Sequence, residues 1–382
     1  MIYIICFALS IFFTYKAEKA FEKNKKKIGI IWSILAVLMP SIVAGLRNTS
    51  VGMDVKAYTT KLYDISLGTD SMFKFLNISW VEPGYSIFVY AVSVIFRDIH
   101  WVLFFTELIM CIFLYLAAYE KRNSIHMYWI MFAYFCIFYN TSLSLMRQGI
   151  SIFITMYALT QMEKKKYIKT ILLFLLATSF HMSNLATIPM YAILYLCSKD
   201  IDKKKKIWIF SIMFVVLIGL LLCYKPILKL VTYDLNILPE KYYDHIKKYD
   251  NGIIDVNYTE LLFKLYWIGM YIVGCIMSKK ILYSKDYNAC SYFIFIMIDL
   301  CVLPVSFKIS NASRITLTYG IIGISMLIPY LLKVLKTYNK NIQQLGYFLI
   351  IGMLLFYWFY SVILYGASAT YPYFSDIIPF LK

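Results

Sequence analysis

The sequence predicts an all-α integral membrane protein, a polytopic bundle of transmembrane helices. Of its 382 residues, 61% are hydrophobic and only 15% are charged. A soluble domain has about 45–50% apolar and about 25% charged residues, so something other than water must cover the excess. Apolar runs recur along the whole chain. We therefore expect a single integral membrane domain over residues 1–382, with no separate catalytic module.

The placement of positive charge supports the same prediction. The formal net charge is +17, and lysines cluster in short tracts between apolar runs, at 23–27, 164–166 and 203–206. Basic tracts beside apolar spans are typical of the cytoplasmic loops of membrane proteins, where they also contact anionic headgroups. Membrane lipids are therefore the expected partners of these lysines, and nucleic acid is not.

The individual helices follow from the length of each apolar run, because a span needs about 20 apolar residues. Eight segments meet this need clearly: 28–46, 101–119, 142–162, 207–224, 259–278, 288–306, 314–333 and 345–366. Five shorter candidates are 2–16, 83–97, 126–140, 168–181 and 182–198. The last two predict a helical hairpin with its turn near His181, and 126–140 pairs with 142–162 around a turn near Asn140.

The positive-inside rule then orients these helices. Segment 83–97 is short and begins with Glu82 and Pro83, so we expect it to be re-entrant or interfacial. Roughly twelve true spans remain, with both termini outside. Loops 47–82 and 225–258 are longer, carry mixed charge and are predicted to lie outside. The basic loops predicted to be cytoplasmic are 16–27, 120–125, 163–167, 199–206, 279–287 and 333–344.

Motifs for soluble catalysis are missing from the sequence. There is no Walker loop, HExxH, GxSxG or CxxC pattern. The eight cysteines lie in or beside apolar runs, which is typical of packing residues, so we expect no disulfide framework, metal site or cofactor. A charged side chain inside a span costs about 2.5–3.5 kcal/mol, which makes such residues the candidates for function.

Six charged or titratable residues are predicted to converge near the outer face: Arg47, Asp54, Glu82, Arg147, His181 and Arg314. Arginine suits phosphate oxygens, and a carboxylate or histidine can take a proton from a hydroxyl. Together they indicate a cavity that binds an anion and moves a proton. Simpler explanations stay open: Arg47 and Glu82 as interfacial caps, and His181 as a hydrogen-bonded turn residue. Asp299 is interpreted as structural.

In their order along the chain, these residues resemble the EpsG family of Wzy-type bacterial polysaccharide polymerases. One departure is Ser313, which stands where the family pattern has Glu before the last arginine. The matching fragments are Arg47–Asp54 with Tyr58, Glu82–Tyr85, Met146–Gly149, Phe180–Ser183, and Arg314 with Tyr319, and the tail Tyr371–Tyr373 is a weaker match.

The resemblance implies a glycosyltransferase of the bacterial cytoplasmic membrane. It would join oligosaccharide units carried on undecaprenyl pyrophosphate into capsular polysaccharide or exopolysaccharide at the outer face, beside a flippase and a chain-length regulator. Arg147 and Arg314 would bind pyrophosphate with help from Arg47, in place of a metal. The general base would be Glu82, Asp54 or His181, in no settled order. Tyr58 and Tyr85 would line the sugar path, and Tyr319 would also contact substrate.

Two other functions would use a similar cavity. A flippase for lipid-linked sugars needs a cationic cavity open to both leaflets and often has internal repeats, which this sequence does not show. A membrane O-acetyltransferase needs a histidine that a cytoplasmic acyl donor can reach, whereas His181 is predicted to lie outside. A purely structural scaffold gains nothing from buried arginines.

Overall fold

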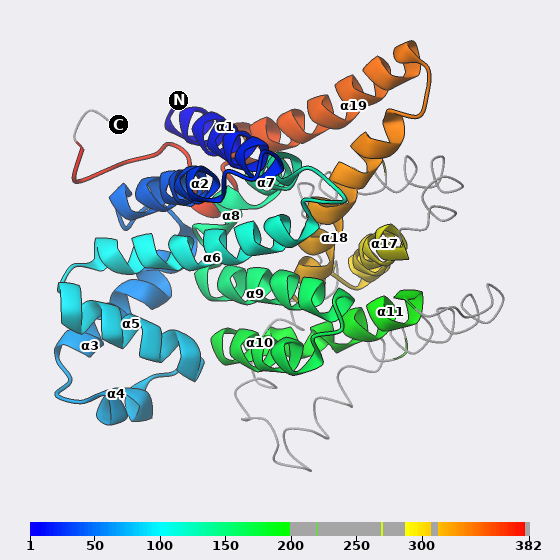
Figure 1. Ribbon diagram of the computed structural model, residues 1–382. Coiled ribbons are helices and arrows are strands. Elements are labelled where there is room, and N and C mark those ends of the chain that lie inside the picture. The colour runs from blue at the N-terminus through cyan, green and yellow to red at the C-terminus, as the bar shows by residue number, and fades with distance from the viewer. Residues whose placement is uncertain (199–218, 220–268, 270–286, 307–311, 379–382) are drawn as a thin grey trace. The chain divides into compact units, whose positions relative to one another are not determined.

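The computed structural model describes residues 1–198, 219, 269, 287–306 and 312–378 (Figure 1). Every regular element in those ranges is a helix, as predicted. The predicted spans 207–224 and 259–278 and the loop 225–258 lie outside the described residues. The chain forms two compact units, Met1–Leu185 with Ser325–Lys382, and Ala186–Ile324. The single domain over the whole chain stays a prediction.

Four described helices are long and apolar enough to cross a membrane: α2 (Lys26–Leu46), α6 (Ile99–Lys121), α18 (Ala312–Leu335), and α19 (Lys340–Trp358) with its continuation η4 (Phe359–Leu364). The expected total of about twelve is not confirmed. Several predicted spans are shorter or broken in the structure. For example, α7 (Met127–Ile137) ends where Phe138 leaves the helical conformation, at φ −137° and ψ −24°.

Helix α5 (Pro83–Phe96) is one of the short ones. Its 14 residues rise about 21 Å, which is less than the roughly 30 Å of a hydrocarbon core. Proline at its first position is favourable because the missing N–H would have no helical partner. Arg97 ends α5 in the left-handed conformation, at φ 52°. Length alone therefore agrees with a re-entrant or interfacial helix.

The first unit is a stack of helices around α9 (Met146–Glu163). Helix α1 (Ile2–Glu22) packs on α2, α2 on α6, α6 on α9, and α9 on α10 (Tyr167–Phe180), as Figure 1 shows. Nearly all side chains of α9 are buried, because it lies between α6 and α10. Arg147 is in the first turn of this central helix.

Three of the predicted cytoplasmic loops meet at one end of the first unit. The buried carboxylate of Glu18 accepts hydrogen bonds from Nδ1 of His126 (2.6 Å) and from the Met127 N–H (2.7 Å). Lys121 forms an ion pair with Glu163 in which both side chains are nearly buried. The positive-inside rule requires these loops to share one side, and these contacts agree with that requirement.

The C-terminal strap, residues 367–378, crosses the end of α2. The Asn48 N–H donates to the carbonyl of Phe374 (2.8 Å), and the Asn48 side-chain amide donates to both Asp376 carboxylate oxygens (2.5 and 2.6 Å). The Gly52 N–H donates to the carbonyl of Ala369 (3.0 Å). Consequently the strap holds the loop that runs from Arg47 to Asp54.

The other elements are short or belong to the second unit. In that unit α17 (Tyr287–Ser306) packs against α11 (Ile188–Ser198). Asp299 is buried there, and a Cβ on Gly320 of α18 would lie only 2.6 Å from its Oδ2. The remaining elements are η1 (Val55–Thr59), α3 (Thr60–Leu67), α4 (Met72–Ile78), α8 (Tyr139–Ser142), η2 (Met182–Thr187) and η5 (Ala367–Ala369).

Candidate functional site

An ion pair between Arg147 and Glu82 is the centre of the candidate site. Glu82 caps the N-terminus of α5, and its Oε2 accepts a hydrogen bond from Nη1 of Arg147. The two residues are 65 positions apart in the chain. The side chain of Arg147 is 21% exposed and that of Glu82 is 10% exposed. Such a pair is stronger than a surface salt bridge because less solvent screens it.

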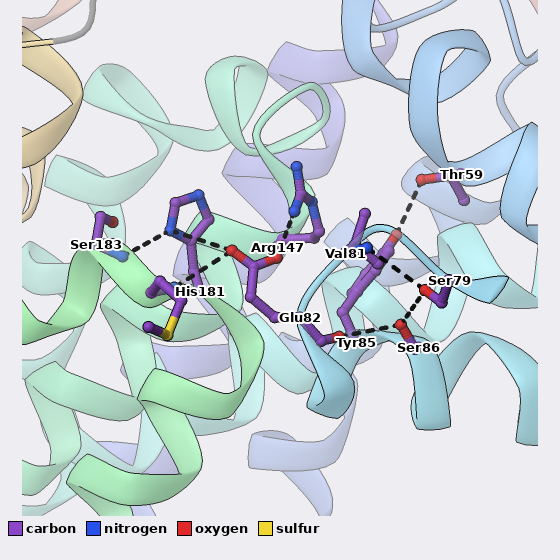
Figure 2. A network of polar contacts seen from close by, with 10 residues as sticks. Thr59, Ser79, Val81, Glu82, Tyr85, Ser86, Arg147, His181 and Ser183 are labelled. Atoms are coloured by element: carbon purple, nitrogen blue, oxygen red, sulfur yellow. Dashed lines mark hydrogen bonds and ion pairs between the residues drawn. The ribbon is translucent and has the colours of Figure 1, made fainter. Parts of the chain in front are cut away.

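The turn after α10 completes the cluster on the other side of Glu82. Oε1 of Glu82 accepts the Met182 N–H at 3.3 Å and lies 4.0 Å from Nδ1 of His181. Figure 2 shows the carboxylate between the Arg147 guanidinium and the His181 ring. The Ser183 N–H donates to His181 Nδ1 at 3.1 Å, so this nitrogen is an acceptor and the neutral ring carries its proton on Nε2.

The surroundings of Glu82 favour its ionised form. Burial alone raises the pKa of this carboxyl, but the charge of Arg147, that of His181 when protonated, and the Met182 N–H outweigh burial. The net effect lowers the pKa of Glu82 below its ordinary value of 4.5. At neutral pH Glu82 is therefore a carboxylate that holds Arg147 in place.

Two further candidates, Tyr58 and Asp54, come from the 47–59 segment. The Arg147 guanidinium lies over the Tyr58 ring, 4.8 Å from its centroid, in a cation–π arrangement. Asp54 caps η1, and its N–H donates to the Ser144 hydroxyl at 3.3 Å. This contact places Asp54 beside the turn that leads into Arg147.

Tyr85 joins two of the elements that carry residues of the cluster. Its side chain is fully buried, and its hydroxyl is hydrogen bonded to Thr59 Oγ1 at 2.9 Å. Tyr85 therefore ties α5 to η1, the element that carries Tyr58. Gly84 allows α5 to approach α10, because a Cβ there would lie 2.7 Å from the carbonyl oxygen of Ser179.

Arg47 lies deeper than the other candidates. Its side chain is 1% exposed, and Nη2 donates to the carbonyl of Leu143 (2.9 Å) and contacts the sulfur of Met146 at 3.4 Å. Within the described part of the chain, Nε and Nη1 of Arg47 have no hydrogen-bond partner. Arg47 is thus next to the turn before Arg147 but buried among protein atoms.

Arg314 and Tyr319 belong to the second unit and are described apart from the cluster. Arg314 is exposed, and Tyr319 is buried with its hydroxyl donating to the carbonyl of Ala186 at 2.6 Å. The expectation that Arg314 shares one face with Arg147 stays a prediction.

A comparison with protein-family models identifies the family to which this chain belongs. The model of the EpsG family matches residues 30–375, which include every residue of the cluster. The chain belongs to the EpsG family. Neither the curated proteins nor the solved structures contain a match to it. The family and the apolar helices together indicate a membrane protein.

One buried carboxylate of this EpsG-family chain was not among the sequence candidates. Glu107, in α6, is 1% exposed and accepts hydrogen bonds from the hydroxyls of Tyr134 and Ser142 and from the thiol of Cys111. A carboxylate in the middle of an apolar run was the signal that could have identified it. In residues 1–198, 287–306 and 312–378, no three His, Cys, Asp or Glu side chains are arranged to hold a metal ion.

Proposed function

We propose that this EpsG-family protein is a polysaccharide polymerase of the bacterial cytoplasmic membrane. It would join oligosaccharide units carried on undecaprenyl pyrophosphate into capsular polysaccharide or exopolysaccharide at the outer face. The family match supports polymerisation. The observation that carries the proposal is the Glu82–Arg147–His181 cluster, because three of the fragments that resemble the family converge on it.

The proposed reaction is a glycosyl transfer with a phosphate leaving group. A hydroxyl oxygen of the acceptor unit forms a bond to the anomeric carbon of the donor chain. The bond from that carbon to the pyrophosphate oxygen breaks, and the lipid pyrophosphate leaves with the bonding electrons. The hydroxyl proton passes to a base. The protein must therefore offset negative charge on the leaving group and accept one proton.

Arg147 is the proposed ligand of the pyrophosphate. Its guanidinium forms planar, paired hydrogen bonds with phosphate oxygens, and Tyr58 holds it from one side. An incoming pyrophosphate competes with Glu82 for this guanidinium. As Arg147 turns toward the pyrophosphate, Glu82 Oε2 loses its cation, which raises the basicity of the carboxylate.

Glu82 is therefore our first choice as the base that accepts the hydroxyl proton. Carboxylates serve this purpose in glycosyl chemistry because the attacking oxygen loses its proton late, once bond formation has acidified it. His181 carries its proton on Nε2 in the neutral ring, which suits it to donate a hydrogen bond to a sugar or phosphate oxygen. Asp54 remains the alternative base, and pyrophosphate binding by Arg314 stays a proposal from the sequence.

The first experiment compares the surface polysaccharide of a deletion strain with that of the complemented strain on a gel. We expect long chains to vanish in the deletion strain, while single lipid-linked units persist and reach the outer face. Units confined to the inner leaflet would instead identify a flippase. Normal chain length with altered acyl content would identify an acetyltransferase.

The substitution Arg147→Ala tests the proposed site directly. We expect this variant to reach the membrane at normal levels and to make no long chains. The control is Arg122→Ala, because Arg122 also lies over a tyrosine ring, 3.7 Å from the centroid of Tyr119, but at the end of the first unit that holds the basic loops. Wild-type chain length in the Arg147 variant at normal expression would reject the proposal.

A further inference from the structure

A buried asparagine, Asn184, lies in the turn that carries His181. Its Nδ2 donates to the carbonyl of Phe174 (3.3 Å) and to the hydroxyl of Thr178 (3.1 Å), both in α10. Its Oδ1 accepts the hydroxyl of Thr155, in α9, at 2.5 Å. Because the Phe174 carbonyl can only accept a hydrogen bond, the amide nitrogen must face α10 and the amide oxygen must face α9. Asn184 therefore ties the turn to two helices at once.

The backbone of this turn is anchored within its own segment. The His181 N–H donates to the carbonyl of Ala177 (3.1 Å), and the Asn184 N–H donates to the carbonyl of His181 (3.0 Å). These bonds set the shape of the turn, whereas the Asn184 side chain adds a tie to α9. Asn184 and Thr155 are both buried, so water does not readily replace their hydrogen bond when one partner is removed.

Helix α9 holds Glu82 at both of its oxygens, directly and through this turn. Arg147 is in the first turn of α9, and Thr155 lies about two turns further along the same helix. Glu82 Oε2 accepts from Arg147, and Oε1 accepts the Met182 N–H of the turn at 3.3 Å. The Glu82 carboxylate is therefore held between two donors, and the hydrogen bond between Thr155 and Asn184 helps to set the distance between them.

We infer that Asn184 is a positioning residue that keeps Glu82 in place when Arg147 turns toward the pyrophosphate. Once Arg147 has left, the Met182 N–H is the hydrogen bond described above that still orients the carboxylate. A base must lie within about 2.6–3.2 Å of the oxygen whose proton it accepts. A turn without its tie to α9 would let Met182 and His181 shift, and Glu82 with them. This role of Asn184 rests on the proposed polymerase function.

The test measures the initial rate of chain extension by Asn184→Leu at several concentrations of lipid-linked repeat units. Leucine is similar in size and leaves the backbone hydrogen bonds of the turn, but it removes the three made by the side chain. Because Arg147 still binds the pyrophosphate, we expect kcat per folded molecule to fall about tenfold or more and KM to stay within about threefold of wild type. A role in stability alone would lower the amount of folded protein and leave both constants unchanged.

Thr155→Val keeps the test decisive if Asn184→Leu does not fold. Valine replaces the hydroxyl that donates to Asn184 with a methyl group, so we expect kcat to fall by about threefold to tenfold. Thr160→Val is the matched control on the same helix. Thr160 is also buried, but its hydroxyl donates to the carbonyl of Tyr157 within α9 at 2.7 Å. We expect the control to keep the kcat and KM of wild type.

Three results would overturn the inference. The first is a wild-type kcat per folded molecule in Thr155→Val and in Asn184→Leu. The second is a higher KM with an unchanged kcat, which would mean that Asn184 acts on substrate binding and not on the base. The third is an equal loss of kcat in Thr155→Val and Thr160→Val. Arg147→Ala, assayed beside them, tests the polymerase function separately, since wild-type chain length in that variant rejects the function whatever the Asn184 variant does.

Discussion

Replacing Glu82 with Gln is the most direct test of the Glu82–Arg147 pair. Gln keeps the size of the side chain and an acceptor oxygen for the Met182 N–H, but it removes the charge that holds Arg147. The Arg147 side chain is 21% exposed and the Glu82 side chain is 10% exposed. The energy of this pair is therefore expected to lie between that of a surface salt bridge, about 0–1 kcal/mol, and the cost of breaking a fully buried pair, about 3–5 kcal/mol.

We therefore take about 2 kcal/mol for the loss of positioning, which corresponds to about a 30-fold lower rate of chain extension. If Glu82 is also the proton acceptor, the loss grows by a further factor of about 10²–10⁴. The assay is the consumption of lipid-linked repeat units by membranes that contain equal amounts of each variant, with product length read on a gel. The size of the loss in rate shows whether Glu82 only positions Arg147 or also accepts the proton.

Glu163→Gln is the matched control. Glu163 is also 10% exposed and paired with a buried cation, Lys121, at the end of the first unit that holds the basic loops. We expect this variant to be less stable than wild type but to extend chains at the wild-type rate per folded molecule. The reasoning about Glu82 is refuted if Glu82→Gln extends chains within about threefold of wild type, because a threefold change corresponds to about 0.7 kcal/mol, which a surface salt bridge already accounts for.

Two further predictions concern the same cluster. Because the pKa of Glu82 is lowered, its contribution to stability is fully present above pH 4.5 and is lost as the pH falls through the lower folded value. The melting temperatures of wild type and Glu82→Gln should therefore differ above pH 4.5 and converge below it; a constant difference would contradict this. In Gly84→Ala the new methyl group should force α5 away from the Ser179 carbonyl, which lowers the free energy of unfolding by about 1–3 kcal/mol and slows chain extension. Gly352→Ala, where nothing lies within 4 Å of the new Cβ, should leave the rate unchanged, and equal rates in the two variants would contradict the close-approach argument.

The sequence predicted which residues lie near one another better than it predicted how they pair. Hydropathy and positive charge indicate the end of the molecule on which each loop lies, which is why Glu82, Arg147 and His181 were expected together. They do not indicate which side of a helix faces a neighbour. Because α9 is buried on almost every side, its hydropathy pattern gives no sign that Arg147 faces Glu82.

The same limit explains the depth of Arg47 and the length of the helices. The structure buries the Arg47 side chain against Leu143, and the expectation that Arg47 helps bind pyrophosphate stays a prediction. The two groups that it contacts, the Leu143 carbonyl and the Met146 sulfur, lie 96 and 99 residues further along the sequence. Hydropathy counts apolar residues but does not detect a break such as Phe138, so it overestimates the length of continuous helices.

The C-terminal strap has a consequence for biogenesis. Asn48 is synthesised 328 residues before Asp376, its hydrogen-bond partner. Until the strap emerges from the ribosome, the inserted N-terminal helices have Glu82 and Arg147 but lack the residues that tie down the Arg47–Asp54 loop. Contacts this distant in sequence close late, because the intervening chain must first be ordered. The proposed polymerase would acquire its finished site only after the strap has been synthesised, so polypeptides that stall before this point would not extend polysaccharide.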